Sequence, residues 1–373
     1  MSLSPAHLRV AVNLLWLAPG RVGGSEQYLV RQLSGLADQS IDPVVFCQPA
    51  FSDAHPELAS KLAVVVGPLR RDRRVTRIMA EHTWLAARTR AVDVVHHGGG
   101  TTPVVGKRPI VLTVHDLQYL RYPEYFGRGR RAYLDRMMPR SVERAAIVTV
   151  PSAYVRRRVV EAFGIDPEKV LVVPHGVPDL APPSADQVTS TLARYGLDGG
   201  RPFVVYPAIT HPHKGHLLLI DMLADLDTDV ALVLIGGAGA AEAEIEQAIA
   251  GIADASRVVR TGRVSDLDRD VLVSAAAALV FPSEYEGFGA PLVEAMVFDT
   301  PVVCSAAEAV VEVAGGAAVV VAEPTPEAWA NGVLEALANP RTLIERGRSR
   351  RQAFTLEICG RALADAYRLA AGS

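Results

Sequence analysis

The chain has few cysteines and few aromatic residues, and it lacks a long apolar run. Its three cysteines are Cys47, Cys304 and Cys359, an odd number without paired spacing. This usage favours a reducing cytosol and argues against a disulfide framework or a zinc site. No apolar stretch approaches the roughly 20 residues that a membrane helix needs. The apolar segment at residues 10–18 is short and has no cleavage site, so we interpret it as a first buried strand and not as a signal peptide.

The composition is that of a globular protein with two domains. Of the 373 residues, 49% are apolar and 21% are charged, which excludes a disordered chain. A chain of this length is too long to fold around a single hydrophobic core and suits two domains. Residues 1–179 contain 24 Lys and Arg against 16 Asp and Glu, a net charge of +8. The remainder contains 14 against 25, a net charge of −11. This asymmetry predicts that the first half meets an anionic partner.

Three basic clusters carry much of the positive charge of the first half: residues 70–77 (RRDRRVTR), 128–131 (RGRR) and 156–158. They form either a solvated face or a patch for an anionic membrane surface or an acceptor phosphate. We therefore expect a cytoplasmic protein with possible peripheral contact at the inner membrane face. No nucleic-acid-binding module or interleaved aromatic pattern is present, and we expect no nucleic-acid partner.

Short apolar runs alternate with helix-like stretches in both halves, a pattern typical of doubly wound parallel sheets. The expected strands of the first half are residues 9–14, 44–47, 62–66, 92–96, 110–114, 147–150 and 170–173. Those of the second half are residues 203–206, 231–235, 257–261, 278–281, 301–304 and 317–321. The segment PDLAPP at 178–183 is the natural linker, preceded by a hinge at His175 and Gly176.

The segment EGFGAPLVE at residues 286–294 is the most informative part of the chain. It follows the strand expected at 278–281, and it places Glu286 in a glycine-rich loop and Glu294 on the following helix. Pro291 falls in the first helical turn, where its missing amide costs little. Open parallel sheets bind ligands beyond the carboxyl ends of their strands, and a carboxylate accepts two hydroxyl donors. Two carboxylates flanking free amides therefore suit a nucleotide sugar. A plain surface turn before a helix with a favourable Glu is the alternative.

The same segment resembles the signature of the retaining glycosyltransferases of family 4, which adopt the GT-B fold of two Rossmann-like domains facing an interdomain cleft. The resemblance implies that Glu286 holds a donor-sugar hydroxyl and Glu294 the ribose diol. It extends through Gly23-Gly24, His115-Asp116, VVPHGV at 172–177, Lys214-Gly215 and TPVVCS at 300–305. It implies an acceptor-side domain at residues 1–180, a nucleotide-sugar domain at 181–355, and a C-terminal helix at 356–373 that packs back on the first domain.

The remaining motifs of the resemblance lie at strand ends. Gly23 and Gly24 precede a helix expected at residues 25–38 and allow close approach to a diphosphate. His115 is expected near the reacting carbon, and Asp116 orients His115 or the acceptor. Lys214 matches one member of the family's basic pair. The second member is missing, and Thr210 or a protonated His213 is the expected partial replacement.

Taken together, the resemblance implies catalytic roles for His115, Asp116, Lys214 and Glu286. It implies donor contacts for Gly23, Gly24, Thr210, His213, Lys214, Gly237, Arg263, Val264, Glu286, Gly287, Phe288, Gly289, Ala290, Leu292 and Glu294. Two Asp-x-Asp pairs, Asp227/Asp229 and Asp266/Asp268, look like metal motifs, but we interpret both as structural, and no metal or cofactor is expected. In His96-His97-Gly98-Gly99-Gly100 the two histidines point in different directions, and the glycines are expected to admit substrate or a partner domain.

The resulting hypothesis is a metal-independent transferase that moves a hexose from a nucleotide sugar to a saccharide, a lipid-linked or a small-molecule acceptor. The phrase from Thr113 to Phe126 looks like polysaccharide mannosyltransferases and favours GDP-mannose slightly over a UDP-hexose. A nucleotide-sugar epimerase or hydrolase of the same fold is an alternative, as is a non-catalytic nucleotide-sugar-binding protein.

Overall fold

The chain folds into two compact units, each built around its own parallel sheet. The computed structural model describes residues 7–20, 23–36, 40–69, 74–106, 109–226 and 229–372. The first unit comprises Met1–Pro178 together with Phe354–Ser373, and the second comprises Asp179–Ala353. Residues 70–73 of the first basic cluster, and Asp227 and Thr228 of the first Asp-x-Asp pair, lie outside the described residues.

The first unit contains a seven-stranded sheet in the order β3-β2-β1-β4-β5-β6-β7. All neighbouring strands pair in parallel. The strands are β1 (Leu8–Leu14), β2 (Ile41–Cys47), β3 (Ala63–Val66), β4 (Val94–His97), β5 (Ile110–Thr113), β6 (Ile147–Val150) and β7 (Val170–Val172). Each expected strand is present, with ends that differ by a few residues. Strands such as β4, β5 and β6 are buried along their whole length, and therefore appear in the sequence as continuous apolar runs.

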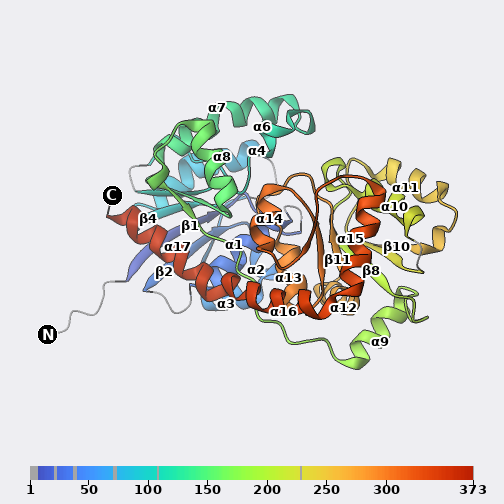
Figure 1. Ribbon diagram of the computed structural model, residues 1–373. Coiled ribbons are helices and arrows are strands. Elements are labelled where there is room, and N and C mark those ends of the chain that lie inside the picture. Colours follow the sequence, from blue (N-terminus) through green and yellow to red (C-terminus); the bar gives the residue numbers. More distant parts are fainter. Residues whose placement is uncertain are drawn as a thin grey trace. The chain divides into compact units, whose positions relative to one another are not determined.

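Helices cover both faces of this sheet (Figure 1). They are α1 (Gly24–Ser34), α2 (Ala50–Ala54), α3 (Pro56–Lys61), α4 (Arg74–Ala80), α5 (Ala86–Arg88), α6 (Gln118–Arg121), α7 (Arg128–Arg144), α8 (Ala153–Phe163) and α17 (Leu356–Ala371). One π-helix, η1 (Glu81–Leu85), joins α4 to α5, and the short 3-10 helices are η2 (Pro123–Tyr125) and η3 (Pro167–Lys169). Between β4 and β5 the described residues form no helix.

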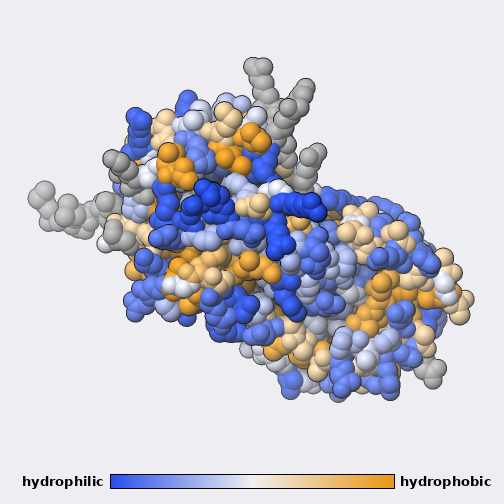
Figure 2. Space-filling model, turned by 90° about the horizontal axis from the view of Figure 1, so that it is seen from above, coloured by the Kyte–Doolittle hydropathy of each residue, from blue (hydrophilic) through white to orange (hydrophobic). Residues whose placement is uncertain are grey.

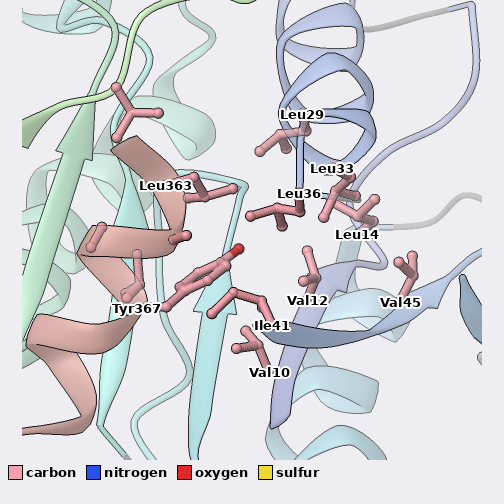
Figure 3. Close-up of a cluster of buried hydrophobic side chains, with 14 of the residues drawn as sticks. Val10, Val12, Leu14, Leu29, Leu33, Leu36, Ile41, Val45, Leu363 and Tyr367 are labelled. Atoms are coloured by element: carbon pink, nitrogen blue, oxygen red, sulfur yellow. The ribbon is translucent and has the colours of Figure 1, made fainter. Parts of the chain in front are cut away.

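The last helix, α17, belongs to the core of the first unit. Figure 3 shows Leu363 and Tyr367 of α17 meeting Leu29 of α1, Leu36 just after that helix and Val10 of β1 in one buried cluster. The two helices approach so closely that a Cβ on Gly360 would lie 1.9 Å from the carbonyl oxygen of Gly35. Glycine is therefore required at this crossing. The chain returns to the first unit beside its exit, where Val177 pairs with Thr355.

The second unit contains a six-stranded sheet in the order β10-β9-β8-β11-β12-β13, again with parallel neighbours. The strands are β8 (Phe203–Pro207), β9 (Ala231–Ile235), β10 (Val258–Gly262), β11 (Ala278–Phe281), β12 (Val302–Ser305) and β13 (Val319–Val321). The α-helices are α9 (Ala185–Arg194), α10 (His216–Asp225), α11 (Glu242–Gly251), α12 (Asp266–Ala275), α13 (Ala290–Val297), α14 (Glu308–Ala314), α15 (Pro326–Ala338) and α16 (Pro340–Arg351). Short 3-10 helices are η4 (Pro212–Lys214), η5 (Ala255–Arg257) and η6 (Gln352–Phe354).

The surface in Figure 2 is mostly hydrophilic, with hydrophobic residues gathered in separate small patches. Among the described residues, no helix combines the length and the apolar character required to cross a bilayer.

Candidate functional site

In the second unit, β8 and β11 mark the point at which the strand order changes direction. The strand β8 is the first of the unit, and the chain continues through β9 and β10 on one side and β11 to β13 on the other. Loops after β8 and β11 therefore leave in opposite directions and open a crevice at the carboxyl edge of the sheet. Lys214 follows β8 and Glu286 follows β11, so both lie at this edge.

Lys214 and Glu286 form an ion pair, with Nζ and Oε1 2.5 Å apart. The two loops that carry them are also joined through Tyr206, whose hydroxyl donates to the carbonyl of Lys214 at 2.8 Å and lies 2.9 Å from Ser283 Oγ. The amide of Glu284 donates to the carbonyl of His213 at 2.9 Å. Burial raises the pKa of Tyr206, and the charge of Glu286 adds to that effect. The ion pair is thus held on a rigid, hydrogen-bonded base.

The loop after β11 leads directly into α13. Gly289 caps this helix in a left-handed conformation with φ of 96°, and a proline occupies its first turn as expected. The side chains of Phe288 and Leu292 are 4% and 0% exposed and belong to the core. These two residues can therefore meet a ligand only through their backbones, as can Gly287 and Gly289, while Ala290 opens the helix.

Glu294 lies in the second turn of α13 and faces charged residues of α12. Burial lowers the pKa of Arg269, but the negative charges of Glu294 and Asp270 raise it overall. Arg269 also binds Asp266 at 2.8 Å and Asp270 at 2.9 Å. Glu294 is therefore part of a charged cluster on α12 and α13.

Thr210 and His213 add no positive charge to the site. Thr210 Oγ1 donates to Glu242 Oε2 at 2.6 Å and accepts from the amide of Gly239 at 2.6 Å, so its hydroxyl is engaged within the fold. Burial, followed by the charge of Lys214, lowers the pKa of His213 to about 4. His213 is therefore neutral near pH 7, which contradicts the expectation that a protonated His213 compensates for the missing basic residue.

The loops after β9 and β10 pack against each other at the same edge. A Cβ on Gly237 would lie 2.7 Å from Nε of Arg263, so the Arg263 side chain runs directly over this glycine. A Cβ on Gly236 would lie 2.2 Å from the carbonyl oxygen of Ala208. Val264 is half-buried beside Arg263. The expected donor residues of these loops thus share the edge that carries Lys214.

In the first unit, Gly23 and Gly24 form the open start of α1. Gly23 caps the helix with φ of 58°, and a Cβ on either glycine would meet nothing within 4 Å. In the first turn, Glu26 accepts from the amide of Gly20 at 2.8 Å and lies 2.8 Å from His55 Nε2. The helix start therefore offers amides to an incoming anion while Glu26 fixes the loop before it.

His115 follows β5 and has a defined orientation. Its Nε2 donates to the carbonyl of Gly98 at 2.8 Å. Burial lowers its pKa, against the raising effects of the Gly98 carbonyl and of Asp116. The ring is therefore neutral, with its proton on Nε2 and an acceptor lone pair on Nδ1. Asp116 Oδ1 accepts from the amide of Gln118 at 2.8 Å, which closes the turn after the strand.

Aromatic residues that the sequence analysis did not select surround His115. Its ring centroid is 5.9 Å from that of Trp16 and 5.3 Å from that of Tyr28. Tyr28 in turn donates to the carbonyl of Val173 at 2.6 Å. Trp16 could have been selected because it comes just after β1, at the carboxyl edge of the sheet. Tyr28 lies at a position where the helical spacing of α1 predicts a core residue, so the sequence gives no indication that it lies beside His115.

The neighbouring histidines have other partners. His96 Nδ1 lies 2.8 Å from the hydroxyl of Tyr367, and its Nε2 lies 2.7 Å from Thr113 Oγ1. His97 points to the other face and meets Asn13, as the alternation along a strand requires. Cβ atoms on Gly98 and Gly99 would lie 2.5 Å from Leu29 and 2.7 Å from Trp16. Gly98 and Gly99 therefore make room for the protein's own side chains, while the expected approach of a substrate or partner domain to this segment stays a prediction.

The second Asp-x-Asp pair has a structural role. The amide of Asp268 donates to Ser265 Oγ at the start of α12. The carboxylate of Asp268 pairs with Arg194 of α9 at 2.7 Å. Over the described ranges, no three His, Cys, Asp or Glu side chains are grouped in a way that could hold a metal ion.

Comparisons with known proteins identify the family of the chain. The family model of glycosyltransferase family 4 matches residues 22–179, and that of glycosyl transferases group 1 matches residues 189–353. The O-antigen chain mannosyltransferase B of Escherichia coli is 26% identical, over 74% of this chain and 74% of its own. The O-antigen chain mannosyltransferase RfbU of Salmonella typhimurium is 25% identical, over 86% of this chain and 89% of its own.

Solved structures show the same fold. The crystal structure of Anabaena HepE in complex with UDP and glucose superposes with a TM-score of 0.76 at 20% identity, covering 96% of this chain and 99% of that one. Sucrose-phosphate synthase from Thermosynechococcus elongatus superposes with a TM-score of 0.74 at 23% identity, covering 97% and 98%. With two parallel sheets, the strand-edge motifs and both family matches, the chain belongs to glycosyltransferase group 1, family 4, and has the GT-B fold.

Proposed function

We propose that the protein is a retaining, metal-independent hexosyltransferase that uses a nucleotide sugar as donor. The observation that carries this proposal is the Lys214–Glu286 pair at the β8–β11 junction. It places one cation and one hydroxyl acceptor side by side, as a sugar diphosphate requires. Lys214 then neutralises the diphosphate, Glu286 holds a hydroxyl of the sugar, and Glu294 holds the ribose.

The mechanism follows from the charges that develop. The bond between the anomeric carbon and the diphosphate oxygen breaks, which leaves positive character on the sugar and negative charge on the phosphate. Lys214 and the amides at Gly23 and Gly24 stabilise the negative charge, a preorganised electrostatic contribution. The Nδ1 lone pair of His115 accepts a hydrogen bond from a sugar hydroxyl. The acceptor hydroxyl attacks on the same face, and the departing phosphate takes its proton.

Two features bear on the identity of the donor: the similarity to characterised relatives and the loops after β9 and β10. The similarity to mannosyltransferases of Escherichia coli and Salmonella typhimurium supports GDP-mannose as the first candidate for this chain. The complex of Anabaena HepE with UDP and glucose keeps a UDP-hexose as the second candidate. In this proposal the backbone around Gly237, Arg263 and Val264 reads the base. The acceptor is a saccharide, a lipid-linked saccharide or a small molecule, and the basic residues of the first unit contact an anionic membrane surface when the acceptor is lipid-linked.

The test combines ligand binding with product analysis. The full chain is heated with UDP, GDP, UDP-glucose or GDP-mannose, and the true donor pair is expected to raise Tm because it binds only the folded state. Labelled donor is then incubated with and without saccharide acceptors in the presence of EDTA. Acceptor-dependent transfer with the anomeric configuration retained is the expected result. Rapid sugar release or isomerisation without acceptor would indicate a hydrolase or epimerase, and tight binding without turnover would indicate a binding protein; each would overturn the proposal.

A further inference from the structure

A cavity of about 670 Å³ lies in the first unit, where His97 at the end of β4 forms part of its wall. Its walls are η1 and α5 on one side, and the β4–β5 connection at residues 103–106 on the other. The cavity exists because the described part of that connection forms no helix to cover β4 and β5. Its volume falls within the range of roughly 300–1,000 Å³ typical of small-molecule sites. The π-helical turn in its wall is also a feature that recurs at functional sites.

Asn13 organises the polar part of the wall. Its Oδ1 accepts from the amide of Leu15 at 3.1 Å, which fixes the orientation of the side-chain amide. Its Nδ2 therefore donates both hydrogens, one to Glu81 Oε1 at 3.3 Å and one to His97 Nδ1 at 3.0 Å. Asn13 thus holds Glu81 and His97 beside each other, and each of them lines the cavity.

One polar atom of each side chain is left for a ligand. Because His97 Nδ1 accepts a hydrogen bond, the proton of its neutral ring is on Nε2; burial lowers the pKa of His97 to about 3. Within the described residues, neither His97 Nε2 nor Glu81 Oε2 has a hydrogen-bond partner. The two residues are only 3% and 7% exposed. Two buried side chains therefore bring a donor and an acceptor to the cavity wall.

The rest of the lining is mixed. Thr83 and Thr89 supply hydroxyls, while Leu85, Val95 and Val105 supply apolar surface. Burial raises the pKa of Glu81, against the lowering effects of Arg77, its ion-pair partner at 4.0 Å, and of the hydrogen bond from Asn13. A ligand for this wall needs neighbouring groups that both donate and accept, and it needs a non-polar face. Hydroxyl groups on a sugar ring have both properties.

We propose that this cavity binds a neutral saccharide unit through Glu81 and His97, and that the unit is part of the acceptor of the transfer reaction. The second half of the proposal rests on the proposed transferase function. The connection to the transfer site is short, since His97 precedes Gly98, whose carbonyl accepts the hydrogen bond from His115. A saccharide bound to His97 would therefore contact the residue next to Gly98, and the Gly98 carbonyl in turn fixes the orientation of the His115 ring.

Binding is tested directly on the full chain, without donor. Methyl α-mannoside, methyl α-glucoside and maltose are titrated by saturation-transfer NMR, with glucose 6-phosphate as the charged comparison. Glu81→Gln replaces the acceptor oxygen by an amide, and Ala86→Leu fills the cavity from α5. Ala162→Leu on the exposed face of α8 is the matched control. At least one neutral sugar is expected to bind the wild type and the control, with affinity at least tenfold lower in Ala86→Leu and Glu81→Gln.

Two results would overturn the binding claim: no neutral sugar binds the wild type, or Ala86→Leu binds as well as Ala162→Leu. If Glu81→Gln fails to fold, Ala86→Leu alone decides. The acceptor assignment has a separate readout, because Ala86→Leu should raise the KM for the acceptor at least tenfold while the KM for the donor stays unchanged. Loss of sugar binding with an unchanged acceptor KM would refute that assignment. Absence of any nucleotide-sugar binding would instead refute the proposed function and leave the cavity result standing.

Discussion

Lys214 and Glu286 neutralise each other across the junction of β8 and β11, at 2.5 Å and with side chains only 21% and 16% exposed. An arriving diphosphate must therefore share Lys214 with a carboxylate. The second basic residue that the family resemblance implies is missing from the loop after β8, where Thr210 is engaged with Glu242 and His213 is neutral. The ion pair thus sets how much positive charge the diphosphate meets.

Glu286→Gln should separate nucleotide binding from sugar transfer. Removal of the carboxylate charge leaves Lys214 unopposed, so the affinity for the free nucleoside diphosphate should rise about threefold to tenfold, or up to ~1.4 kcal/mol. The sugar loses a hydrogen bond that matters in the transition state, so kcat/KM should fall about a hundredfold. Isothermal titration and steady-state kinetics measure the two effects. Glu284→Gln, an exposed carboxylate two residues earlier, is the control. Weaker nucleotide binding with normal turnover would contradict this account.

Lys214→Met should weaken nucleoside diphosphate binding about tenfold or more, because no other described cation of the β8 loop replaces its charge. Lys214→Arg should recover most of the loss, since the positive charge remains. The salt dependence of the dissociation constant provides a second measurement, and it should be flatter for Lys214→Met than for the wild type. Equal affinities for the three proteins would show that the diphosphate binds elsewhere.

The sequence predicted the strands well and the side-chain networks poorly. Runs such as Ile147–Val150 and Ala278–Phe281 are buried on both faces, so their apolar composition identifies them without reference to other parts of the chain. The partnership of Lys214 with Glu286 depends on which strands become neighbours, and local patterns carry no such information. The contact of Asn13 with Glu81 and His97 joins residues far apart in the sequence. His213 is neutral because its side chain is buried, and the polar sequence around it gave no indication of that burial.

Gly360→Ala should destabilise the first unit strongly. The new Cβ would lie 1.9 Å from the carbonyl oxygen of Gly35, a rigid backbone atom, so α17 must move away from α1 and open the cluster in Figure 3. We expect a loss of about 3 kcal/mol or more in the free energy of unfolding, comparable to other severe core changes. Gly129→Ala in α7 meets nothing within 4 Å and should be neutral or stabilise by up to about 1 kcal/mol. Urea denaturation compares the two, and equal stabilities would contradict close packing of α1 and α17.

Acid should destabilise the protein below pH 6.5 through His96. Burial, followed by electrostatic interaction with the neighbouring His97 and His115, lowers the pKa of His96 to about 3, against 6.5 in the unfolded chain. Between these values the unfolded state binds the proton and the folded state does not, so stability falls as pH falls from 6.5 towards 3 and is constant above 6.5. By pH 5 the contribution of His96 should reach about 2 kcal/mol.

His97 acts in the same direction, whereas Glu81 partly offsets both because burial raises its pKa. Urea unfolding at pH 7, 6 and 5 measures the slope for the wild type and for His96→Gln, which retains polar contacts for Tyr367 and Thr113 but has no group that titrates. The fall in the free energy of unfolding from pH 7 to pH 5 should be about 2 kcal/mol smaller in His96→Gln than in the wild type. His7→Gln, at an exposed position, serves as the control and should keep the wild-type slope. An unchanged slope in His96→Gln would mean that His96 accepts a proton in the folded protein without penalty.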